Sequence, residues 1–198
     1  EMLVYHTKHG GPVEKLTGLE YLTNPEIKQN FKLILRYFVA RWGYSTAVFS
    51  WDLWNEVNLI PGFDTMVNEA KEWHREMAEY LEQIDWAGHV THTNFNIVNG
   101  YPPIDSLPVM DLVSVNTYTS LDFAPSAEYW IKRHLSEYRK PVMFSEFGIG
   151  HSYGEEGYAP LDPMCIMAHN GMWSSLMSGS AGTETVSSSP FSRRIAFS

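Results

Sequence analysis

The chain has 198 residues, of which 44% are hydrophobic, and this is enough for one compact domain with a substantial core. Its formal net charge of −9 argues against nucleic acid or an anionic membrane as a partner, because both attract basic surfaces. A neutral glycan is compatible with this charge. The single cysteine, Cys165, excludes a disulfide bond within the chain, and no apolar run has the length of a membrane span.

The first part of the chain is predicted to be irregular up to Leu22, because Gly10-Gly11-Pro12 interrupts any regular pattern. A helix follows. Thr23-Asn24-Pro25-Glu26 offers an N-cap, a proline for the first turn and a capping-box glutamate. Apolar residues then recur at helical spacing as far as Trp42, and Gly43 is predicted to end the helix.

A short apolar strand is predicted next, over residues 47–56, with the sequence AVFSWDLWNE. Its nearly continuous apolar character is typical of a parallel strand that is covered by helices on both faces. Glu56 ends the run. This acid is therefore predicted at the carboxyl end of a strand, where α/β folds place their chemistry.

The rest of the chain alternates between the two patterns. Residues 66–84 carry an apolar stripe opposite a charged face, which indicates an amphipathic helix. Strands are predicted over residues 89–98, 112–118 and 141–148, a helix over residues 126–140, and a further helix leading toward another strand over residues 171–183. This alternation predicts an α/β fold with a parallel sheet and right-handed crossovers. The strand over 141–148 also ends in a glutamate, Glu146, followed by glycine.

The two glutamate motifs resemble those of a known group of enzymes. Trp54-Asn55-Glu56-Val57 resembles the acid/base motif that ends the fourth strand in clan A of the retaining (β/α)8 glycoside hydrolases. Ser145-Glu146-Phe147-Gly148 resembles the nucleophile motif that ends the seventh strand. The nearest resemblance is to the family 5 cellulase-like and mannanase-like enzymes, and it covers residues 22–183.

The resemblance implies a partial TIM (β/α)8 barrel, because a complete one has eight strands in about 250 residues. We expect strands 4 to 7 with flanking helices, no strands 1–3, and further chain upstream of Glu1 in the parent protein. Residues 1–183 would be the partial catalytic domain, and the serine-rich residues 184–198 are expected to be a disordered tail. The exposed sheet edges of such a piece could lead to self-association.

The resemblance also implies the chemistry, which is cleavage of an oligo- or polysaccharide such as cellulose or mannan. Glu56 would be the general acid and base and Glu146 the nucleophile, with their carboxyl groups about 5–5.5 Å apart, as retention of configuration requires. Asn55 resembles the amide that contacts the sugar 2-hydroxyl, and Tyr118 resembles the tyrosine that hydrogen-bonds the nucleophile. His151 could touch the substrate, although a surface histidine is the simpler interpretation.

No cofactor and no metal are expected. His89 and His92 are three residues apart, which places them on opposite faces of a strand, and this suggests a metal pair only weakly. No phosphate-binding glycine loop is present. No signal peptide is recognised in this sequence, so the localisation cannot be read from it directly, and only the family resemblance suggests secretion.

Two other interpretations remain. The chain could be a catalytically incompetent barrel fragment or carbohydrate-binding remnant that keeps a sugar-contacting groove. It could also be a parallel-sheet interaction protein with no sugar role. Aromatic residues make up 14% of the chain and can stack on sugars, but most such rings fill protein cores.

Overall fold

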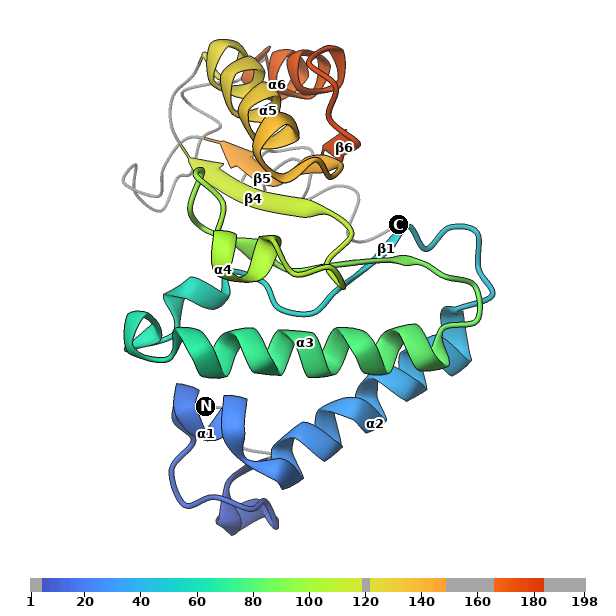
Figure 1. Cartoon of the computed structure of the whole chain (residues 1–198), viewed down its shortest axis with the longest axis vertical. Coiled ribbons are helices and arrows are strands. Elements are labelled where there is room, and N and C mark those ends of the chain that lie inside the picture. The colour runs from blue at the N-terminus through green and yellow to red at the C-terminus, as the bar shows by residue number, and fades with distance from the viewer. Residues whose placement is uncertain (1–4, 119–121, 149–165, 184–198) are drawn as a thin grey trace. The chain divides into compact units, whose positions relative to one another are not determined.

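A computed structural model of the chain describes residues 5–118, 122–148 and 166–183 (Figure 1). The chain divides into two compact units, and the structure defines each unit separately. Unit 1 comprises Glu1–His92 and Pro102–Met110, and unit 2 comprises Thr93–Tyr101 and Asp111–Ser198. None of the described helices has both the length and the apolar character needed to cross a membrane.

Unit 1 is mainly helical. Its helices are α1 (Gly18–Thr23), α2 (Pro25–Trp42), α3 (Val67–Ile84) and α4 (Pro102–Asp105), with 3-10 turns at Thr7–His9, Val57–Leu59 and Phe63–Thr65. The predictions of α2 and α3 are confirmed. α2 begins at the predicted cap, because the Asn24 side chain accepts hydrogen bonds from the backbone N–H groups of Glu26 (3.0 Å) and Ile27 (3.3 Å).

The short helix α1 lies where an irregular segment was predicted, so that prediction is wrong for its last residues. The hydroxyl of Thr17 accepts a hydrogen bond of 3.1 Å from the backbone N–H of Glu20 and caps this helix. Thr17 and Glu20 have the spacing of a capping box. The signal was therefore present in the sequence, although no long apolar stripe follows it.

The helices α2 and α3 lie side by side and run in the same direction (Figure 1). Their contact is both aromatic and ionic. The rings of Phe31 and Trp73 have centroids 4.9 Å apart, and Trp73 is almost completely buried. Lys28 and Lys32 of α2 bind the carboxylate of Glu76 on α3 at 2.6 and 2.7 Å. α2 is thereby fixed on α3 by one of its faces.

The strand that leads to Glu56 is shorter than predicted. β1 spans only Ser50–Asp52 and pairs in parallel with β2 (Val90–His92). The carboxylate of Asp52 accepts a hydrogen bond of 3.1 Å from the backbone N–H of Trp54, and a turn of this kind competes with further strand pairing. Glu56 therefore lies in the turn beyond β1, and its predicted place at the strand end is wrong.

Unit 2 contains a four-stranded parallel sheet in the order β3-β4-β5-β6. Its strands are β3 (Asn94–Phe95), β4 (Val113–Tyr118), β5 (Val142–Gly148) and β6 (Gly182–Thr183). The predicted strands over residues 112–118 and 141–148 and their parallel pairing are confirmed. The strand predicted over residues 89–98 is instead two short strands, because β2 pairs with β1 and β3 pairs with β4.

The helices α5 (Ala124–Tyr138) and α6 (Ile166–Met177) cover the same face of the unit 2 sheet (Figure 1). The core beneath them contains Val113, Val115, Phe123, Ala127, Ile131, Val142, Phe144 and Phe147. Gly171 allows α6 to lie close to this core, because a Cβ atom at that position would be 2.2 Å from the ring of Phe147. The tail at residues 184–198 lies outside the described residues.

Asp85 ties the end of α3 to β1. Its Oδ2 atom accepts hydrogen bonds from the Trp51 indole N–H (2.9 Å) and the His89 backbone N–H (3.0 Å), and His89 Nδ1 lies 2.8 Å from the same oxygen. Burial by itself would raise the pKa of this carboxyl group, but the hydrogen bonds from Trp51, His89 and Ala87 together hold the pKa below its ordinary value. Asp85 is therefore a buried, charged acceptor for donors from the half-buried residues Trp51 and His89.

We expect the substitution Asp85→Ala to lower the free energy of unfolding at pH 7 by about 1–3 kcal/mol, because the half-buried donors of Trp51 and His89 lose a charged acceptor. The pKa of Asp85 is lower in the folded chain than in the unfolded chain, so its contribution is complete above the unfolded pKa and is lost as the pH falls through the folded pKa. The difference between variant and wild type should therefore shrink below about pH 4. Urea denaturation at pH 7 and pH 3 measures both effects.

Asp64→Ala is the matched control, because Asp64 is exposed in the 3-10 turn Phe63–Thr65. Its effect should stay within about 0.5 kcal/mol. Equal stability of the Asp85 variant and the wild type at pH 7 would contradict the role given to Asp85.

Candidate active site

A β-bulge in β5 brings Glu146 to the face of the unit 2 sheet that α5 and α6 do not cover. Val115 is paired with Phe144 and Asn116 is paired with Glu146, so Ser145 is an extra residue in β5. A bulge of this kind shifts the alternation of side chains by one position. Phe144 and Phe147 can therefore both enter the helix-covered core.

The shift in side-chain alternation at the bulge determines which face of the sheet Glu146 occupies. In a regular strand Glu146 would share the face of Phe144, because the two are separated by one residue. That face is packed against α5 and apolar, so a carboxylate there would lose its hydration. With the bulge, Ser145 and Glu146 instead lie beside the polar residues of β4.

The hydroxyl of Tyr118 donates a hydrogen bond to Oε2 of Glu146. Tyr118 is the last residue of β4, and Glu146 lies near the end of β5, so this contact is at the carboxyl edge of the parallel sheet. Both side chains are half-buried. The carboxylate of Glu146 is thus oriented by a donor, and the residue is not fully buried.

A buried chain of hydrogen bonds supports the bulge. The Ser145 hydroxyl donates to Oδ1 of Asn116 at 2.8 Å, and its oxygen lies 2.7 Å from the hydroxyl of Ser114. Because Ser145 has one hydroxyl proton, Ser114 must be the donor in the second contact. Ser114 and Asn116 are fully buried and Ser145 is 6% exposed, so these bonds are shielded from water.

Asn55 and Glu56 lie in the turn that follows β1 in unit 1. Glu56 has φ 53° and ψ 46°, a left-handed conformation that is uncommon for a residue other than glycine. Its carbonyl oxygen accepts a hydrogen bond of 2.9 Å from the N–H of Leu59, which closes the 3-10 turn Val57–Leu59. Such backbone strain is often found at functional positions.

The residues on either side hold this turn in place. The Trp54 ring packs edge-on against Tyr21 and Trp73, with centroid distances of 4.5 and 5.4 Å. Val57 on the other side is fully buried. Asn55, which is exposed, and Glu56, which is half-buried, therefore project from a turn with an anchor at each end.

His92, one of the two histidines of the weakly suggested metal pair, instead lies buried against residues of β1. It is 3% exposed, its Nε2 atom lies 3.0 Å from the hydroxyl of Ser50, and its Nδ1 atom lies 3.8 Å from Oδ1 of Asp52. Alternation along β1 puts Ser50 and Asp52 on one face. Their contact with His92 depends on the register of β1 and β2. That register cannot be predicted from the sequence.

His89, the other histidine of the weakly suggested metal pair, binds Asp85 instead. Across the described residues of both units, no three His, Cys, Asp or Glu side chains come together as a metal site would require.

The structure thus brings two of the predicted site residues into contact, Tyr118 and Glu146 in unit 2. It places Asn55 and Glu56 next to each other in unit 1. Because the two units are defined separately, the predicted distance between the carboxyl groups of Glu56 and Glu146 stays a prediction. His151 lies outside the described residues.

The solved structures with a similar fold include two mannanases and a β-glucuronidase. The endo-1,4-β-D-mannanase of Thermotoga petrophila matches 93% of this chain and 59% of its own chain, with a TM-score of 0.63 and 20% identity. A second structure of an endo-β-1,4-mannanase from the same organism matches with a TM-score of 0.63 and 18% identity, over 93% of this chain and 45% of that one. A β-glucuronidase of an uncultured Clostridium species matches 82% of this chain and 30% of its own, with a TM-score of 0.58 and 16% identity.

At identities of 16–20% the likeness to these structures establishes the fold alone. The chain has the α/β fold of part of a TIM barrel, and it spans 59% or less of the length of each of these neighbours. No family model matches the chain, and no curated protein matches it.

The buried hydrogen bonds of Ser145 with Ser114 and Asn116 lead to a prediction about stability. We expect Ser145→Ala to lower the free energy of unfolding by about 1–3 kcal/mol, because the buried side chains of Ser114 and Asn116 each lose a hydrogen-bond partner. Ser136→Ala is the matched control, since Ser136 is exposed on α5 and its loss should change stability by no more than about 0.5 kcal/mol. Urea denaturation of the three proteins measures the effect, and equal losses for both variants would show that the network does not support the bulge.

Proposed function

We propose that this chain is part of a retaining glycoside hydrolase that cleaves β-linked polysaccharide, with Glu146 as the nucleophile and Glu56 as the acid and base. The observation that carries the proposal is the contact between Tyr118 and Glu146 at the carboxyl edge of a parallel sheet, with the bulge directing the acid away from the core. The two glutamate motifs and the glycosidase neighbours support the same assignment.

The proposed reaction has two steps. In the first, a Glu146 oxygen attacks the anomeric carbon while Glu56 gives its proton to the departing glycosidic oxygen, which forms a covalent glycosyl-enzyme and releases the leaving sugar. In the second, Glu56 takes a proton from water, and the water oxygen attacks the anomeric carbon and releases Glu146. Configuration is retained because the anomeric carbon is inverted twice.

The neighbouring residues have supporting roles in this proposal. The Tyr118 hydroxyl holds the Glu146 carboxylate in one orientation before attack. Asn55 projects from the same anchored turn as Glu56 and would contact the sugar 2-hydroxyl next to the reacting carbon. His151, which lies outside the described residues, would touch the substrate in this proposal. The proposed substrate class, a mannan- or cellulose-like chain, is what the family resemblance implies, and the mannanase neighbour supports it.

A binding remnant is the second candidate. The observation in its favour is that Asn55 is exposed and Tyr118 is half-buried, so both could contact a sugar without any bond being cleaved. A part of a barrel could retain stacking and hydrogen-bonding groups for sugars without a complete catalytic cleft.

The experiment that separates the candidates is covalent labelling with dinitrophenyl 2-deoxy-2-fluoro glycosides of mannose and cellobiose, read by intact mass and peptide mapping. The wild type should gain one glycosyl group on Glu146, and Glu146→Gln should gain none. Glu56→Gln should still be labelled, because the dinitrophenyl leaving group needs no protonation. Its hydrolysis of unactivated glycans should fall by about 10²–10⁴-fold, the range expected for losing a general acid.

Glu137→Gln, an exposed substitution on α5, is the matched control and should be labelled like the wild type. An unlabelled wild type whose tryptophan fluorescence is quenched by mannohexaose or cellohexaose would overturn the hydrolase proposal in favour of the binding remnant. An unlabelled protein without quenching would contradict both candidates.

A further inference from the structure

His92 contacts the segment that leads to Glu56 through both its backbone and its side chain. Its carbonyl oxygen accepts a hydrogen bond of 2.8 Å from the N–H of Leu53, the residue that follows β1. Its imidazole lies between two side chains of β1, with Nε2 3.0 Å from the Ser50 hydroxyl and Nδ1 3.8 Å from Oδ1 of Asp52. His92 is paired with Asp52, the last residue of β1, so it lies where the chain leaves the strand toward Glu56.

The partners of the His92 ring favour a proton on Nδ1. The Ser50 hydroxyl can donate to Nε2 or accept from it. If Nε2 carried the only ring proton, the lone pair of Nδ1 would face the Asp52 carboxylate and be repelled by it. With Ser50 as the donor, the Nδ1–H group faces Asp52 and attracts it. The distance of 3.8 Å is too long for a direct hydrogen bond, so the contact is electrostatic, and it is little screened on the histidine side because that side chain is 4% exposed.

The same oxygen of Asp52 connects His92 to the backbone of the turn. Oδ1 faces Nδ1 of His92 and also accepts the hydrogen bond of 3.1 Å from the backbone N–H of Trp54. The Asp52 side chain is 32% exposed, so without an attractive neighbour it could rotate into water and release this N–H group. His92 therefore restricts the orientation of the carboxylate on which the start of the turn depends.

The turn that carries Glu56 needs a directional restraint of this kind. Its left-handed backbone at Glu56, with φ 53°, persists only where the surroundings enforce it. The packing of Trp54 and Val57 anchors the two ends of the turn, but apolar contacts are not directional. The hydrogen bond from the Trp54 N–H to Asp52 does have a direction, and it acts two residues before Glu56.

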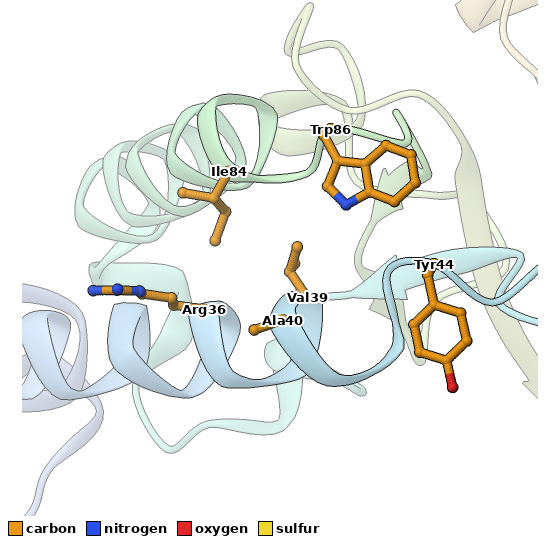
Figure 2. Close-up of a pocket in the computed structure, with 6 residues that line it drawn as sticks. All are labelled: Arg36, Val39, Ala40, Tyr44, Ile84 and Trp86. Carbon is orange, nitrogen blue, oxygen red and sulfur yellow. The ribbon is translucent and has the colours of Figure 1, made fainter.

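The residues that precede β1 and β2 line a separate surface hollow and take no part in this link. The hollow has a volume of about 330 Å³ and is lined by Arg36, Val39, Ala40, Tyr44, Ile84 and Trp86. Figure 2 shows Val39 and Ala40 on the side of α2 that faces Ile84 and Trp86, with Tyr44 beyond the end of the helix. Tyr44 is 74% exposed, so its substitution gives a control within unit 1.

We propose that His92 is a positioning residue for the turn that carries Asn55 and Glu56, and that it acts through the carboxylate of Asp52. The catalytic meaning of this role rests on the proposed function, in which Glu56 is the acid and base. His92 itself touches no reacting atom in that scheme. Its part is to keep the Trp54 N–H bonded, so that the residues after it leave β1 in one direction.

Hydrogen–deuterium exchange of the full chain, followed by NMR, tests the link without any use of enzymatic activity. His92→Leu keeps the bulk of the side chain and removes both ring nitrogens. Its Trp54 amide should exchange at least about 10-fold faster than in the wild type, because a hydrogen bond to a charged acceptor is weakened. The buried Met77 amide of α3 should keep its wild-type rate. His92→Asn, whose amide nitrogen takes the approximate place of Nδ1, should keep the Trp54 rate within about 3-fold of the wild type.

The catalytic readout is kcat/KM for two kinds of glycoside. Cleavage of mannohexaose or cellohexaose needs the proton of Glu56, whereas a dinitrophenyl leaving group needs none. His92→Leu should lower kcat/KM for the hexasaccharide that the wild type cleaves by about 10-fold or more, and leave kcat/KM for the matching dinitrophenyl glycoside unchanged. His92→Asn should restore the first value. A general loss of folded protein would lower both values by the same factor.

His134→Leu is the matched control, because it is the same substitution at a fully buried histidine of unit 2. It should leave the ratio of the two kcat/KM values unchanged, and Tyr44→Ala should leave both the ratio and the Trp54 exchange unchanged. An unchanged Trp54 amide in His92→Leu would overturn the proposal, as would equal acceleration at Trp54 and Met77. A wild type that cleaves neither substrate would contradict the proposed function, and the Trp54 exchange would still decide whether His92 holds the turn.

Discussion

The arrangement of the candidate site depends on one extra residue in a strand. Without the bulge at Ser145, β5 would have to place either Glu146 in the apolar core or Phe147 outside it. The bulge removes this conflict, and the buried bonds of Ser145 with Ser114 and Asn116 make it a fixed feature of the sheet. The same bulge thus allows Phe144 and Phe147 to pack in the core and keeps the side chain of Glu146 out of it.

Much of the fold was predictable from the sequence, because its signals are local. The cap at Asn24 defined the start of α2, and the alternation in β4 and the apolar run of β5 defined two central strands. The predictions were wrong where contacts between distant residues determine the ends of a strand. The side chain of Asp52 ends β1 early, and the separate partners of β2 and β3 divide what looked like one strand.

The candidate site was predictable only in part, for the same reason. The motifs identified Glu146 and Glu56, and the resemblance paired Tyr118 with Glu146, which the structure shows in contact. The bulge, the bonds of Ser145 and the links from His92 to Ser50 and Asp52 all depend on the register between strands. The register between strands cannot be inferred from a single sequence, so these contacts could be identified only in the structure.

The central claim is that Glu56 and Glu146 act on one glycosidic bond from opposite sides. An experimental structure of the chain with a bound mannan or cello-oligosaccharide would give the distance between their two carboxyl groups. The account predicts about 5–5.5 Å, the separation of a retaining pair. A separation of about 6.5–9.5 Å would contradict retention, and acids on opposite sides of the molecule would contradict glycoside hydrolysis by this pair altogether.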